Sequence, residues 1–84
     1  MVFTTGTIST CAGGNHLSLP ITISGNTRTL NFTMDELRGD PPANLAEARE
    51  AILTRLRSAV KEFVTGSPTS LEVQLAINNK TFQV

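Results

Sequence analysis

Apolar side chains recur at every second position of one segment, at Leu17, Leu19, Ile21 and Ile23. This period of two predicts a β-strand with one apolar face. Folding the chain about Gly25-Asn26 sets Ile21 opposite Leu30, and Leu19 is then opposite Phe32. The apolar residues of both strands fall on one face, so the pattern predicts a β-hairpin over residues 16–33.

A second alternating segment lies near the C-terminus, with apolar residues at Leu71, Val73, Leu75 and Ile77. Folding about Asn78-Asn79 sets Leu75 opposite Phe82 and Val73 opposite Val84, which predicts a second hairpin over residues 70–84. Leu71 and Leu75 also fit a helical step, and Ser70 is able to cap a helix there. The unbroken alternation and the turn pair after it favour the strand.

Between the two hairpins, apolar residues recur at steps of three and four, the spacing of one helix face. These residues are Leu45, Ala48, Ile52, Leu56, Ala59 and Phe63, flanked by Leu53 and Val60. Asn44 is the expected N-cap with Glu47 three residues later, and Gly66 and Pro68 end the pattern. The sequence predicts a long amphipathic helix over residues 44–65, preceded by a single helical turn after the Thr33–Glu36 capping box.

The first fifteen residues carry a weaker signal. Threonine is frequent in residues 2–10, which favours extended chain, and Gly13-Gly14 indicates a loop. We expect an N-terminal edge strand or arm. Pro20 interrupts the donors of the next strand, so that strand is expected to be a sheet edge or bulged there.

Together these elements predict a single α+β domain over residues 1–84. Its two β-hairpins form an antiparallel sheet that packs on one long amphipathic helix, in the order ββ(β)-α-ββ. A chain of this length has a small core, and its one cysteine excludes an internal disulfide.

Charge and targeting signals narrow the partner classes. Seven basic and seven acidic residues give a net charge of zero, so the overall field does not favour nucleic acid. No apolar run approaches a membrane span, and the N-terminus lacks a secretory signal. We expect an intracellular or virion protein with no membrane contact and no small-molecule substrate.

The sequence offers little reactive chemistry. Cys11 and His16 form a conceivable nucleophilic pair, but no orienting group or oxyanion donors accompany them, so we expect a solvent-facing histidine. One cysteine and one histidine do not suffice for a zinc site, and Gly13-Gly14 lacks the Lys and Ser/Thr of a phosphate loop. We expect no catalytic residue, no metal and no cofactor.

One basic cluster supports an alternative. Arg55, Arg57 and Lys61 lie late in the long helix, and Arg57 and Lys61 are one turn apart. They are candidate nucleic-acid contacts for a small regulator, but the chain has no Trp or Tyr for base stacking. Cations near a helix C-terminus also complement its dipole on a solvated face.

The polar strand residues are mostly uncharged, and edge strands with few charges are poorly protected against pairing with another chain. Strand addition to a protein partner, or self-association, is therefore the interaction we expect. An ordinary hydrated β surface on a monomer is the alternative. The candidate edge residues are Thr22, Thr27, Thr29, Thr81 and Gln83.

Several segments resemble small proteins encoded in tailed-phage and prophage genomes. They are residues 8–17, 19–21 and 48–57, the last from Ala48-Arg49-Glu50 to Arg55-Leu56-Arg57. The resemblance implies a non-enzymatic protein of virion structure, assembly or host interference, and it carries no functional residue with it. With the uncharged strand edges, it predicts a protein–protein interaction module.

Overall fold

The computed structural model describes residues 1–11, 15–38 and 47–84. The strands are β1 (Val2–Thr5), β2 (Ser9–Thr10), β3 (His16–Ile23), β4 (Asn26–Thr33) and β5 (Thr81–Gln83). The helices are α1 (Met34–Arg38), α2 (Glu47–Phe63) and α3 (Ser70–Ile77). All the strands pair antiparallel, and β3 lies between β4 on one side and β1 with β2 on the other. The predicted α+β class with an antiparallel sheet is confirmed.

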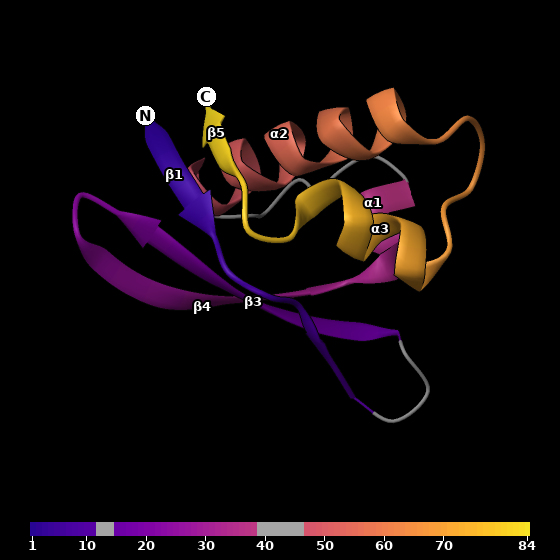
Figure 1. Ribbon diagram of the computed structural model, residues 1–84, viewed down its shortest axis with the longest axis horizontal. Coiled ribbons are helices and arrows are strands. Elements are labelled where there is room, and N and C mark those ends of the chain that lie inside the picture. The colour runs from indigo at the N-terminus through magenta and orange to yellow at the C-terminus, as the bar shows by residue number, and fades with distance from the viewer. Residues whose placement is uncertain (12–14, 39–46) are drawn as a thin grey trace.

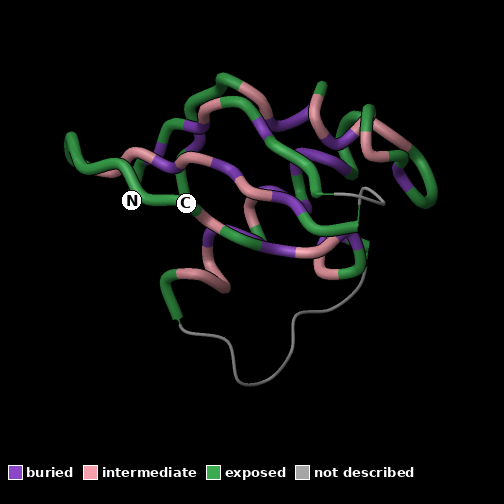
Figure 2. Tube along the Cα trace, turned by 90° about the horizontal axis from the view of Figure 1, so that it is seen from below, coloured by how far each residue is buried: buried purple, intermediate pink, exposed green. Residues whose placement is uncertain are grey.

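The three helices of the described residues lie together on one face of the sheet, and none of them lies on the other face (Figure 1). The buried apolar side chains form one cluster between the sheet and the helices. Buried positions alternate with less buried ones along β1, β3 and β5 (Figure 2). Leu19, Phe3 and Leu56, which come from β3, β1 and α2, are completely buried there. One core therefore joins the N-terminal strand, the hairpin and the long helix.

The first hairpin forms with a register two residues from the predicted one. Leu19 pairs with Leu30 and Leu17 with Phe32, and the turn is Ser24-Gly25 instead of Gly25-Asn26. Both turn residues have positive φ, 51° and 83°, as a two-residue hairpin turn of the favoured hand requires. A shift of two residues leaves every side chain on its predicted face.

The second hairpin is a wrong prediction. Residues 70–77 form the helix α3, and only β5 of the expected hairpin is a strand. Thr69 is the N-cap, and its side chain and that of Glu72 form a reciprocal capping box. Val73 and Ile77, four residues apart, are fully buried, whereas Leu71 and Leu75 are exposed. The alternating apolar residues of this segment therefore belong to a helix that buries only Val73 and Ile77 of the four.

The long helix is confirmed over Glu47–Phe63, with Ile52, Leu53, Leu56, Ala59 and Val60 buried. Its predicted first turn, with Asn44 and Leu45, lies outside the described residues. Phe63 was expected in the apolar stripe, but it is 51% exposed, because the buried stripe ends one turn earlier. Thr33 and Glu36 cap α1 as predicted.

The N-terminal strand is not at an edge. β1 lies between β3 and β5, so the expectation of an edge strand or arm is wrong in its position. Thr5 pairs with Ile21 and Ser9 with Ser18. The chain therefore advances four residues between these two pairs on one side and only three residues along β3. The extra residue makes a bulge opposite Pro20. The extra residue lies on the partner strand and β3 is an interior strand, so the expectation that the strand of Pro20 is itself an edge or bulged is wrong in its position.

Candidate functional site

The outer edge of β4 is the longest sheet edge without a strand partner among residues 1–11, 15–38 and 47–84. The carbonyl of Pro20 accepts from the N–H of Gly6, so the polar backbone atoms of Pro20 face away from β4. Thr29, which pairs with Pro20, therefore directs its own N–H and C=O outward. Thr27 and Asn31, two residues to either side, do the same.

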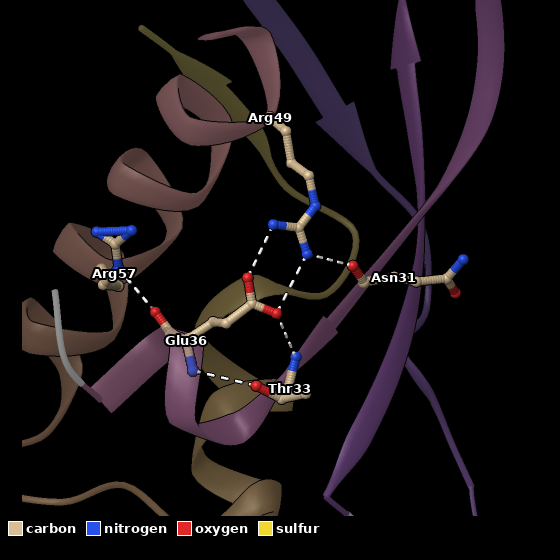
Figure 3. A network of polar contacts seen from close by, with 5 residues as sticks. All are labelled: Asn31, Thr33, Glu36, Arg49 and Arg57. Atoms are coloured by element: carbon tan, nitrogen blue, oxygen red, sulfur yellow. Dashed lines mark hydrogen bonds and ion pairs between the residues drawn. The ribbon is translucent and has the colours of Figure 1, made fainter. Parts of the chain in front are cut away.

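One end of this edge is blocked by an ion pair (Figure 3). Arg49 on α2 donates from Nη1 to Oε2 of Glu36 at 2.8 Å and from Nη2 to Oε1 at 3.1 Å. The same Nη2 donates to the outward carbonyl of Asn31 at 2.6 Å, and the N–H of Thr33 donates to Glu36 Oε1 at 3.0 Å. The edge is therefore hydrogen-bonded at residues 31 and 33, whereas the outward backbone groups of residues 27 and 29 have no partner among the described residues.

The Glu36 carboxylate is held in its charged form. Its hydrogen bonds from Arg49 lower its pKa below the usual value near 4.5, against the opposing effect of burial, and the bond from the Thr33 N–H adds to the lowering. The side chain of Glu36 is 17% exposed and that of Arg49 27%. A half-buried bidentate pair of this kind is stronger than an exposed one.

A groove of about 500 Å³ opens beside the free part of the edge, between the hairpin and the first turns of α2. Its lining is mostly apolar, and its charged residues are two arginines. Arg28 is exposed, and its side chain makes no hydrogen bond or ion pair within the part of the chain that the structure describes. The lining includes Ile21, Ile23, Arg28 and Leu30 from the sheet, and Ala48, Arg49 and Ile52 from α2.

The open face of the sheet carries a row of threonines across four strands. Thr27 pairs with Thr22, Thr22 with Thr4, and Thr4 with Thr81. The hydroxyls of Thr22 and Thr27 are 2.7 Å apart, and those of Thr4 and Thr81 are 3.3 Å apart. The structure thus brings together three predicted edge residues, and sequence reasoning missed Thr4 because it lies far away in the chain.

The five predicted edge residues lie on three different strands, of which one is interior. Thr27 and Thr29 lie on the free edge strand β4, whereas Thr22 lies on β3, which has partners on both sides. Thr81 and Gln83 lie on β5, a strand of three residues at the opposite edge. Of the described strands with a free side, β4 alone is long enough to offer several successive backbone groups to a partner.

The basic cluster predicted on α2 does not form one exposed surface. Arg57 is only 7% exposed, and its Nε donates to the carbonyl of Glu36 at 2.8 Å. Arg55 donates to the carbonyl of Gln83 and lies over the ring of Phe82, 5.0 Å from its centroid. Lys61 alone of the three is exposed. Arg55 and Arg57 therefore connect α2 to β5 and to α1.

Cys11 and His16 are neighbours, because the N–H of Cys11 donates to the carbonyl of His16. His16 is exposed at the first residue of β3, as predicted. In the part of the chain that the structure describes, no three Cys, His, Asp or Glu side chains gather as metal ligands would. No helix there is long and apolar enough to span a bilayer.

Comparisons with protein-family models, with curated proteins and with solved structures found no significant match. The site therefore has to be interpreted from its own geometry. Sequence reasoning identified Glu36 as a capping residue, but nothing in the sequence marked Arg49 as its partner, since the two residues lie on different helices.

Proposed function

We propose that this protein is a non-enzymatic protein–protein interaction module, which binds its partner as an added strand on the outer edge of β4. One observation carries the proposal. The backbone groups of Thr27 and Thr29 point outward with no strand partner among the described residues, next to a groove that is open to solvent. Such an edge offers backbone hydrogen bonds for affinity, and a neighbouring pocket gives side-chain specificity.

The composition of β4 supports this use. Proteins usually protect sheet edges with short strands, charges or proline. β4 has eight residues, of which Arg28 alone is charged, and it contains no proline. The bonds from Arg49 and Glu36 close only the end near α1, so they would stop an added strand at Asn31.

We further propose a phage-encoded setting, in virion assembly or an accessory role. The support for this is the sequence resemblance of residues 8–17, 19–21 and 48–57. A module that works through a strand edge suits assembly, where each contact needs shape and backbone pairing and no reactive group.

Thr29→Pro tests strand addition. The N–H of Thr29 points outward, so proline there removes no hydrogen bond of the β3–β4 ladder, yet it removes a donor for an added strand. Thr29→Ala is the matched control, because it loses the side chain and keeps the N–H. We expect a fluorescein-labelled peptide of alternating Thr and Val to bind the wild type and Thr29→Ala, and to lose binding to Thr29→Pro.

Two results would contradict the proposal. One is peptide binding that Thr29→Pro leaves unchanged while circular dichroism shows both variants folded. The other is binding of labelled duplex DNA that falls steeply with salt and is lost in Arg55→Gln and Lys61→Gln, which would favour the nucleic-acid alternative. Light scattering at several concentrations shows whether a second copy occupies the edge.

A further inference from the structure

We infer that the partner strand is an acidic, partly apolar peptide segment, with a carboxylate opposite Arg28 and an apolar side chain opposite Leu30. This inference rests on the proposed strand addition and specifies its partner. Arg28 and Leu30 pair with Ile21 and Leu19, whose side chains are buried toward the helices, so both residues lie on the helix-facing side of β4. In an added strand, the two residues opposite them share that side.

The groove fits an apolar side chain at the second of these positions. Leu30 lines it from the sheet and Ile52 lines it from α2, and its volume of about 500 Å³ exceeds that of any single side chain. A valine or leucine opposite Leu30 would remove its own apolar surface and that of the groove from water. Residues of the added strand that are opposite Thr27 and Thr29 lie on the open face and need no apolar side chain.

The charge of the lining selects a carboxylate. Among residues 1–11, 15–38 and 47–84, the charged residues that line the groove are Arg28 and Arg49, and none of its lining residues there is acidic. Arg49 already has the Glu36 carboxylate, whereas Arg28 has no ion-pair partner among the described residues. An Asp or Glu opposite Arg28 supplies the opposite charge at the rim, where cross-strand charge pairs are favourable.

A second copy of this chain is a poor occupant. An antiparallel pair of β4 strands centred on Arg28 sets Arg28 directly opposite Arg28, and like charges in that position are destabilising. A pair centred on Thr29 avoids this contact but needs the carbonyl of Asn31 as an acceptor, and that carbonyl already binds Arg49 at 2.6 Å. Arg28 and Arg49 thus disfavour these two symmetric registers.

Fluorescence anisotropy with three labelled heptapeptides tests the inference. Each peptide has threonine at positions 1, 3, 5 and 7 and valine at position 4, and positions 2 and 6 are Asp, Val or Lys. The arrangement is symmetric, so it suits either strand direction. We expect the Asp peptide to bind about fivefold more tightly than the Lys peptide or better, which is the scale of one rim ion pair.

Arg28→Glu should reverse the order of the Asp and Lys peptides, and Thr29→Pro should abolish the binding of all three. Arg28→Gln is the matched control, which should remove the preference without reversing it. Raising the salt concentration should narrow the difference between the peptides.

The remaining outcomes separate this inference from the proposed function. Equal binding of all three peptides, lost in Thr29→Pro, would overturn the acidic partner and leave strand addition intact. Self-association that Thr29→Pro abolishes, with no peptide bound, would mean that a second copy is the occupant and would likewise overturn the inference. Binding of any peptide that is unchanged in Thr29→Pro would overturn both.

Discussion

The hydroxyl of Thr5 accepts a hydrogen bond from the backbone N–H of Lys80 at 2.9 Å, and the N–H of Thr5 donates to the carbonyl of Lys80 at 2.8 Å. The same hydroxyl also contacts the carbonyl of Ile77, the last residue of α3. Thr5 is 4% exposed. One threonine of β1 therefore holds the end of α3 and the start of β5 against the sheet.

Thr5→Val should destabilise the fold by about 1 to 3 kcal/mol, because it leaves the Lys80 N–H without its acceptor in a nearly buried place. Valine has nearly the same shape as threonine, so packing changes little. Thr5→Ser, which keeps the hydroxyl, should retain these hydrogen bonds and cost less. Urea titration of the three proteins measures the difference, and an unfolding free energy for Thr5→Val equal to the wild type would contradict the role.

Local signals predicted the first hairpin face, the long helix and the α1 cap, because periodicity and capping depend on neighbours in the sequence. The segment 70–77 was ambiguous, since Val73 and Ile77 fit both an alternating strand and a helical step of four. The signal that distinguishes the helix is the capping box of Thr69 and Glu72, and the alternation of apolar residues gives no weight to it.

Long-range contacts explain what sequence reasoning missed in the site. The pairing of β1 with β5 joins residues about eighty positions apart, and it turns a weak N-terminal strand into an interior one. Glu36 and Arg49 meet only after α2 has packed beside α1. Neither contact produces a periodic pattern in the sequence. The sequence alone therefore does not distinguish the blocked end of the β4 edge from its free end.

Ile77→Ala and Leu75→Ala should have very different costs, although the two residues are neighbours in one apolar pattern. Ile77 is fully buried, so its truncation should cost about 2 to 5 kcal/mol. Leu75 is 56% exposed, and its truncation should change the unfolding free energy by about 0.5 kcal/mol or less. Similar large costs for both, in chemical denaturation, would favour the strand that the sequence predicted.

Glu36 should make the stability fall in acid. Its folded pKa lies below the unfolded value near 4.5, so at the same pH its carboxyl group is protonated less often in the folded state than in the unfolded state. The stabilisation is fully present above pH 4.5 and is lost as the pH falls through the folded pKa. We expect the unfolding free energy to drop less between pH 6 and pH 3 in Glu36→Gln than in the wild type.

Arg49→Gln is the companion variant for this pH dependence. The hydrogen bonds from Arg49 are the largest cause of the lowered pKa of Glu36. Their removal should therefore also reduce the fall of the unfolding free energy in acid, although Glu36 remains in place. Urea titrations at several pH values measure both variants. An equal decrease in unfolding free energy between pH 6 and pH 3 in the wild type and in Glu36→Gln would show that other carboxylates control the acid sensitivity.

Gly6→Ala should destabilise the sheet through a direct contact with Pro20. A Cβ at position 6 would lie 3.1 Å from both Cβ and Cγ of Pro20, closer than ordinary van der Waals contact. Pro20 has a rigid ring in the interior strand β3, so relief requires the backbone to move, and we expect a cost of about 1 to 3 kcal/mol.

Pro20→Gly provides the partner variant for a double-mutant cycle. It removes the crowded atoms, so Gly6→Ala should cost less in that background, and the two changes should be non-additive in urea titration. Additive costs within about 0.5 kcal/mol would mean that the strands separate easily at the bulge. A coupled result would show that the missing side chain of Gly6 lets the chain that follows β1 approach β3 at Pro20.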